Sequence, residues 1–297
     1  MTRARPAALP VALVAALLLA ACSRLDIAYS QLDWVLTWYV DGYVTLTSDQ
    51  GGLMRERVNA LKRWHCTDEV PAYARWVRGT GQELAGAPTV AALDARFAEF
   101  EQALRRLGRQ AAPEIADLLL TASPEQVDAL QASLRKRDEK FRAEWVDIPR
   151  EQLDAKRAAW MVKHLERWLG PLDAAQRARV EAWSRQLIPT AADTLAFREA
   201  WRAALDDALK RRDRPDAFRT RIADLVGDPR RLAPPSREAR FLENRRITWE
   251  MLVDVAVRMS PEQRRTLLAR TGGLAGELEA LACGAAAPER AAVETER

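Results

Sequence analysis

Hydrophobic residues recur at helical intervals along most of the chain, and no segment shows the sustained alternation of a half-buried strand. Proline and glycine interrupt this pattern often enough to leave segments of about 10 to 25 residues, a common length for globular helices. The sequence therefore predicts an all-α fold, a single multi-helix body of about ten helices. The longest irregular stretch covers residues 227–236, where we expect a hinge or a loop.

Two further interruptions predict breaks between helices. Gly79-Thr80-Gly81 has the composition of a loop, and it lacks both the third glycine and the preceding strand of a phosphate-binding turn. Pro113 is expected to end a helix, because proline removes a backbone donor from the helix interior.

Four segments share one pattern at expected helix starts. In each, an oxygen-bearing residue is followed three positions later by glutamine, the arrangement of a capping box. The four segments are Thr47-Ser48-Asp49-Gln50, Ser123-Pro124-Glu125-Gln126, Asp173-Ala174-Ala175-Gln176 and Ser260-Pro261-Glu262-Gln263. Proline in two of them falls on the first helical position, where its missing N–H costs nothing.

The aromatic-rich stretch 25–43 has two apolar faces when it is placed on one helix. The broad face is expected to be core, and it comprises Leu25, Ala28, Tyr29, Leu32, Val35, Leu36, Tyr39, Val40 and Tyr43. Ile27, Trp34 and Trp38 lie on the opposite side. They either pack against another element or form an outward strip that docks on a partner or faces a membrane.

The N-terminus has the layout of a secretory signal. Arg3 and Arg5 precede an apolar run over residues 7–21 that is too short to span a bilayer. The run ends in Leu19-Ala20-Ala21-Cys22, which resembles the bacterial lipobox and implies acylation of Cys22. By resemblance to the sorting rule of Gram-negative lipoproteins, Ser23 favours the outer membrane. The alternative is an ordinary signal peptide followed by a chance cysteine.

These features predict three parts: a lipoprotein signal peptide over 1–21, an all-helical periplasmic domain over 22–284, and a disordered tail over 285–297. The chain carries 46 basic and 42 acidic residues, a net charge of +4, and two of the basic residues lie in the signal. Charges of both signs are interleaved, so we expect no nucleic-acid partner.

Two cysteines remain once Cys22 is assigned to lipid. In an oxidising compartment Cys66 and Cys283 are candidates for a disulfide, and two buried free thiols are the alternative. The histidines, His65 and His164, are far apart, and a site made of His65, Cys66 and Cys283 lacks the paired spacing of structural zinc sites. We expect no metal and no cofactor.

The sequence carries no nucleophile elbow, no phosphate-binding loop and no other catalytic motif with its required context. Its carboxylates alternate with arginine and lysine on helices, as on solvated faces. The expected protein is therefore not an enzyme.

Two resemblances carry information about function. Leu46-Thr47-Ser48-Asp49-Gln50 is similar to the L-T-x-x-Q motif of the small helical periplasmic chaperones of the Spy and CpxP kind. Residues 19–76, with the lipobox, Tyr29-x-x-Leu32-Asp33-Trp34 and Trp64-His65, look like an uncharacterised family of proteobacterial lipoproteins catalogued as a domain of unknown function. That second resemblance implies a helical, lipid-anchored protein and no catalytic residues.

The predicted function is a helical lipoprotein at the periplasmic face of the outer membrane, with a structural or protein-interaction role. Its expected partners are the membrane, through the lipid on Cys22, and an unidentified envelope protein. One alternative is a chaperone-like clamp that binds unfolded or partner proteins on apolar helix faces. The other is an envelope hydrolase, which needs two acids held across a cleft.

Overall fold

The computed structural model describes residues 24–283, and every regular element in that range is a helix. This confirms the all-α prediction. The predicted signal peptide (1–21), Cys22 and the predicted tail (285–297) lie outside the described residues. The α-helices are α2 (Arg24–Ser30), α3 (Leu32–Asp41), α4 (Ser48–Trp64), α5 (Val70–Ala85), α6 (Val90–Leu120), α7 (Pro124–Phe141), α8 (Arg150–Leu169), α9 (Ala174–Gln186), α10 (Ala191–Lys210), α11 (Pro215–Gly227), α12 (Pro235–Val257) and α13 (Pro261–Leu281).

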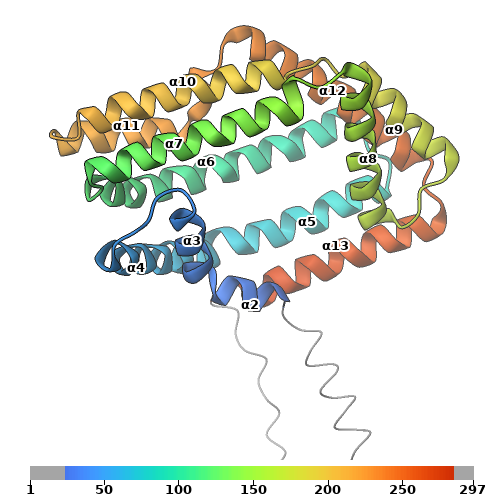
Figure 1. The fold of residues 1–297 in the computed structure, drawn as a ribbon. Coiled ribbons are helices and arrows are strands. Elements are labelled where there is room, and N and C mark those ends of the chain that lie inside the picture. The colour runs from blue at the N-terminus through green and yellow to red at the C-terminus, as the bar shows by residue number, and fades with distance from the viewer. Residues whose placement is uncertain (1–23, 284–297) are drawn as a thin grey trace, which may run out of the picture.

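Three short turns of other helical types join these elements. A π-helical turn (His65–Glu69) links α4 to α5, a second π-helical turn (Arg142–Val146) follows α7, and a 3₁₀ turn (Pro229–Leu232) lies between α11 and α12. In Figure 1, α6, α7, α10 and α11 form one group of long helices, and α5 lies beside α13 on the other side of the molecule. Helices α8, α9 and α12 lie at one end of the body and α3 and α4 at the other.

Two hydrophobic cores hold the body together. One lies between α8, α9, α12 and α13, and Val180, Met251 and Val255 at its centre are almost fully buried. The other joins α6, α10 and α11, where Phe218 and Ile222 pack against Ala116. Burial of apolar surface in these two clusters is the main term that stabilises the fold.

Two predicted breaks are wrong, because tertiary packing keeps both helices intact. Gly79-Thr80-Gly81 lies inside α5, where the missing side chain of Gly81 lets α5 approach Thr271 of α13 closely. Pro113 lies inside α6, whose neighbouring Ala112 and Ala116 are fully buried. The close contact of α6 with α11 outweighs the backbone hydrogen bond that proline removes.

The segment predicted as a hinge or loop, 227–236, is the connection that holds the 3₁₀ turn. Arg230 of this turn forms an ion pair with Glu101 of α6 and stacks on the ring of Phe241 in α12, 4.9 Å from its centroid. The connection is therefore held against α6 and α12.

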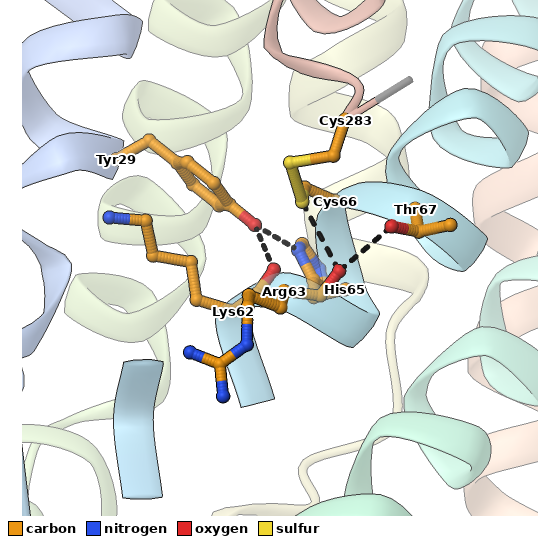
Figure 2. Close-up of a disulfide and its surroundings, with 7 residues drawn as sticks. All are labelled: Tyr29, Lys62, Arg63, His65, Cys66, Thr67 and Cys283. Atoms are coloured by element: carbon orange, nitrogen blue, oxygen red, sulfur yellow. Dashed lines mark hydrogen bonds between the residues drawn. A yellow bond between two sulfur atoms is a disulfide. The ribbon is translucent and has the colours of Figure 1, made fainter. Parts of the chain in front are cut away.

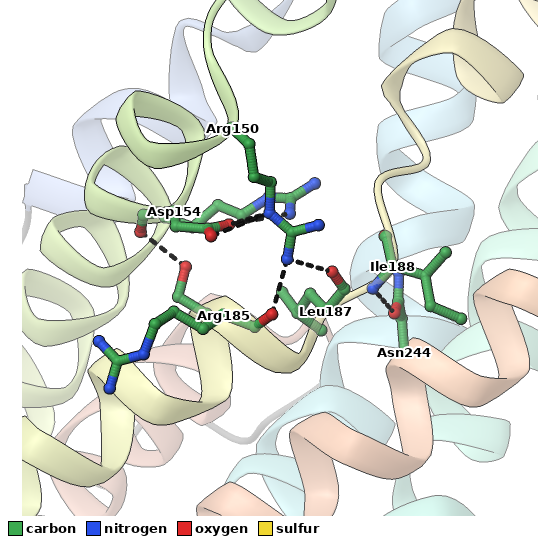
Figure 3. A network of polar contacts seen from close by, with 8 residues as sticks. Arg150, Asp154, Arg185, Leu187, Ile188 and Asn244 are labelled. Atoms are coloured by element: carbon green, nitrogen blue, oxygen red, sulfur yellow. Dashed lines mark hydrogen bonds and ion pairs between the residues drawn. The ribbon is translucent and has the colours of Figure 1, made fainter.

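A polar network closes the corner where α8, α9 and α12 meet (Figure 3). Arg150 at the start of α8 donates to the carbonyl oxygens of Arg185 and Leu187 at distances of 2.6 and 2.9 Å. Asn244 of α12 accepts a hydrogen bond from the backbone N–H of Ile188 and donates one to its carbonyl, both at 2.8 Å. These contacts satisfy backbone groups that the end of α9 leaves without helical partners.

Candidate functional site

Helices α2 and α3, which carry Ile27, Trp34 and Trp38, lie at the edge of the body. Helix α2 docks through Tyr29, whose hydroxyl donates to the carbonyl oxygen of Lys62 at 3.1 Å (Figure 2). The same hydroxyl lies 3.1 Å from Nδ1 of His65, and Lys62 Nζ donates to the carbonyl of Ser30 at 3.0 Å. The start of the described chain is thus held at the junction of α4 and α5.

Cys66 and Cys283 form a disulfide at this junction. The predicted pairing is therefore confirmed, and a metal site that uses these two thiols is excluded because both sulfurs are oxidised. Cys66 lies in the turn between α4 and α5, while Cys283 follows the end of α13 and donates its backbone N–H to the carbonyl of Cys66 at 3.1 Å. The bond spans 217 positions of sequence.

Near the disulfide, hydrogen bonds and burial shift the pKa values of Glu69, Tyr73 and His65. Arg106 donates to both oxygens of the buried Glu69 carboxylate, at 2.6 and 2.9 Å, and this lowers the pKa of Glu69. Burial, with the nearby charge of Glu69, raises the pKa of Tyr73 to about 12. Burial also lowers the pKa of His65, against the opposing charge of Glu69. His65 is half-buried, and its ring contacts the hydroxyl of Tyr29.

Ile27, Trp34 and Trp38 are all exposed, with 62%, 62% and 67% of each residue's surface accessible. The interpretation that another element of the chain covers them is wrong for the described residues. We refer to these three residues as the outer strip. Large exposed aromatic side chains in helix register are typical of docking or membrane-contact surfaces.

The broad face of residues 25–43 is not the well-buried core that the sequence predicts. The stretch divides at Gln31 into α2 and α3, and no residue of α3 is fully buried. Tyr39 is half exposed and stacks edge-on against Tyr43. The physical reason is that α3 lies at the edge of the body and covers a cavity.

All four predicted capping boxes are present, each with both of its hydrogen bonds. The sequence did not show that they meet in pairs. The side-chain amides of Gln50 and Gln126 hydrogen-bond to each other in both directions, at 2.9 and 2.7 Å. Gln176 and Gln263 form the same reciprocal pair, at 3.0 Å each way. Two helix starts are thus joined at each pair.

An apolar cavity of about 400 Å³ lies beside the first pair, between α3, α4, α6 and α7. Its lining is mainly Leu, Val, Ile, Met and Ala side chains, among them Leu36, Val40, Leu53, Ile115, Leu118 and Val127. Arg57 and Glu114 also line it and form an ion pair at 3.3 Å. This volume lies within the range of about 300–1,000 Å³ typical of small-molecule sites.

A second hollow, the α8–α9 groove, is polar. Two of its four carboxylates are paired with arginine: Asp154 accepts from Arg150 at 2.8 Å, and Glu166 is paired with Arg177. Among residues 24–283, no group of three His, Cys, Asp or Glu side chains is placed to hold a metal ion. Within the same range, none of the helices is long and apolar enough to cross a bilayer.

A family model described as a family of unknown function, DUF6279, matches residues 42–237. The chain belongs to this family. The prediction of an uncharacterised domain is thereby confirmed. No curated protein and no solved structure matches the chain.

The matched range includes the Gln50–Gln126 pair and most of the cavity lining, and it begins after the outer strip. The cavity is the feature that sequence reasoning missed. Its apolar residues follow the same helical period as core residues, and nothing in that pattern distinguishes a filled interior from a hollow one.

Proposed function

We propose that the chain is a lipid-anchored envelope protein with a non-enzymatic, interaction-based role. The lipid on Cys22 would tether it to the periplasmic face of the outer membrane, as the lipobox and Ser23 suggest. The body would then be presented to an envelope protein partner. The observation that carries this proposal is the exposure of the outer strip, only a few residues after Cys22.

The geometry of the N-terminus supports this role. Cys22 and Ile27 are five residues apart, so the outer strip begins within roughly 18 Å of the anchor even in a fully extended chain. Tryptophan is favoured at the boundary between lipid and water, where its ring is apolar and its N–H can reach water. The strip would therefore rest on the membrane surface and orient the body.

The carboxylates that have arginine partners also favour an interaction role over hydrolysis. Glycoside hydrolysis needs two carboxyl groups that face a substrate across a cleft. In the α8–α9 groove, Asp154 and Glu166 are each engaged by an arginine side chain. The buried Glu69 is likewise bound by Arg106.

Fractionation of cells that express Cys22→Ala tests the anchor. We expect the variant in the soluble periplasmic fraction and the unchanged protein in the outer-membrane fraction. Recovery of Cys22→Ala with the membrane at the wild-type level would overturn the proposed tether.

The strip is tested on the purified Cys22→Ala protein with vesicles of phosphatidylethanolamine and phosphatidylglycerol. Tryptophan fluorescence should shift to shorter wavelength when vesicles are added, and Trp34→Ser with Trp38→Ser should remove most of the shift. Trp160→Ser is the matched control, because Trp160 is also an exposed tryptophan (53%) but lies on α8. An equal loss of the shift in both variants would contradict a specific role for the strip.

The chaperone-like clamp remains the second candidate, and one observation favours it. The segment that resembles the L-T-x-x-Q motif, Leu46 to Gln50, lies at the apolar cavity, and both Leu46 and Gln50 line it. A clamp should slow the aggregation of a reduced, unfolded model protein at equimolar concentration. Unchanged aggregation in the presence of Cys22→Ala would exclude it.

A further inference from the structure

The molecule contains two copies of one arrangement, and only one of them encloses a cavity. At the Gln176–Gln263 pair, the residues just before the caps, Leu172 and Met259, are buried in the core that α8, α9, α12 and α13 share. At the Gln50–Gln126 pair, the corresponding residues Leu46 and Ala122 line the cavity. The comparison within one chain shows that this arrangement of helix starts does not itself require a void.

The cavity is partly open to solvent, and its walls are almost wholly apolar. Apolar surface left in contact with water is unfavourable. Water is a poor occupant here because it needs hydrogen-bond partners that aliphatic walls do not provide. The cavity is therefore suited to an apolar occupant.

The two glutamine amides beside the cavity have no free group to offer a peptide backbone. Both Gln50 and Gln126 use their amide oxygen and nitrogen: Gln50 donates to the carbonyl of Thr121 at 3.1 Å, and Gln126 donates to that of Thr45 at 2.7 Å. Each also accepts the backbone N–H of its own cap. A peptide unit in the cavity would leave its N–H and C=O unpaired, which is costly.

The lining favours a flexible hydrocarbon chain over a flat ring. Tyr43 is its one aromatic member among the described residues, and the other apolar lining residues are aliphatic. The polar edge is marked by the ion pair of Arg57 with Glu114, and Arg57 Nε is buried there without a hydrogen-bond partner. An amphiphile with one chain inside and its polar end beside Arg57 matches this distribution.

Helix α3 links the cavity to the outer strip. Leu36 and Val40 line the cavity, while Trp34 and Trp38 of the same helix are exposed. No residue of α3 is fully buried, and elements with few buried contacts are those that open most easily. The cover of the cavity is thus the element that the proposed function places against the lipid surface.

We propose that the cavity between α3, α4, α6 and α7 takes a single fatty acyl chain from a lipid of the adjacent membrane. The membrane as source rests on the proposed function, whereas the binding of the chain does not.

The binding step is tested on soluble Cys22→Ala protein, purified without detergent and stripped of lipid. The probe is dansyl-undecanoic acid, whose fluorescence should rise on binding and fall when sodium palmitate displaces it. Ala111→Phe, which places a ring in the cavity wall of α6, should weaken probe binding by about tenfold or more. Ala98→Phe, on an exposed position of the same helix, should bind the probe like the parent.

Circular dichroism and the thermal midpoint report whether each variant folds. If Ala111→Phe does not fold, Val127→Phe places the same ring in the opposite wall on α7, with the exposed Ala132→Phe as its control. Absence of probe binding by the parent would overturn the proposal. Equal binding by a cavity variant and its control would do the same.

The source is tested by incubating the lipid-free protein with vesicles of phosphatidylethanolamine and phosphatidylglycerol, and re-isolating it for native mass spectrometry. We expect one bound lipid per chain, reduced when Trp34 and Trp38 are both replaced by serine. Probe binding without uptake from vesicles would overturn the membrane as source. Fractionation of Cys22→Ala tests the anchor independently, so failure of the anchor and failure of the cavity are distinguishable.

Discussion

At the scale of single residues, each glutamine of the reciprocal pairs makes two kinds of contact with one side-chain amide. Each amide holds its own helix start, and it also binds the glutamine of a second helix. Removing one side chain therefore loses the contact and leaves a buried partner with unsatisfied groups. A buried amide without a partner lowers the free energy of unfolding by more than one ordinary hydrogen bond contributes to it.

Gln263→Ala is expected to lower the free energy of unfolding by about 1–3 kcal/mol, because it leaves the fully buried Gln176 amide without its partner. Urea unfolding measures the loss. Gln176→Ala combined with Gln263→Ala should cost less than the sum of the two single changes. Strict additivity would show that the two amides are not coupled.

His65 and Glu69 make stability depend on acidity. Burial lowers the pKa of His65 below its usual 6.5, so the folded state binds fewer protons than the unfolded state in this window. Stability should therefore fall as the pH drops through and below about 6.5, and the lowered pKa of Glu69 adds a further loss below its usual 4.5.

Thermal midpoints measured between pH 7.5 and 5 should show this fall, and His65→Gln should flatten it above pH 5. His164→Gln, at a half-buried position of α8, is the control for the substitution itself. A slope that is the same in all three proteins would contradict the assignment to His65.

At the scale of elements, the sequence predicted features that depend on neighbouring residues, and it missed the packing of helices that are distant in sequence. The capping boxes could be predicted because every group involved lies within four residues. The break expected at Gly79-Thr80-Gly81 was wrong. Gly81 makes room for Thr271 of α13, some 190 positions away, and does not end a helix. The broad face of α3 was misjudged for a similar reason: helical period shows which side chains face inward, and it does not show how much protein lies there.

Gly81→Ala is expected to separate α5 from α13, since an added Cβ would lie 2.2 Å from Thr271 Oγ1. We expect a loss of about 1–3 kcal/mol in the free energy of unfolding, the usual cost of overpacking. Gly272→Ala in α13 meets nothing within 4 Å and should stabilise the helix by about 0.5–1 kcal/mol. Chemical denaturation measures the free energy of unfolding of both variants. Equal changes in Gly81→Ala and Gly272→Ala would contradict the close approach of α5 to α13.

At the scale of the whole molecule, the disulfide joins the end of α13 to the junction of α4 and α5. α2 docks through Tyr29 on the junction that Cys66 occupies, and α2 also contacts α13. The sequence predicted this bond from the number of cysteines and the expected compartment. It could not show that the bond also lies beside the point where the N-terminal helices leave the body.

Reduction should lower the thermal midpoint, because the bond closes a loop of 217 positions and removes entropy from the unfolded chain, worth up to about 5 kcal/mol. The variant with Cys66→Ala and Cys283→Ala should have the lower midpoint and should not respond to dithiothreitol. Alkylation of both cysteines in the non-reduced wild-type protein would contradict the bond.

The packing of α5 against α13 also governs the order in which the protein can fold. These helices meet across nearly 200 intervening residues, and contacts of such high sequence separation form slowly because a long loop must close first. Pairs such as α8 with α9 are close in sequence and can form early. In a pulse-labelling hydrogen-exchange experiment, amides of α5 should thus gain protection among the last in the chain, although α5 precedes most of the helices in sequence.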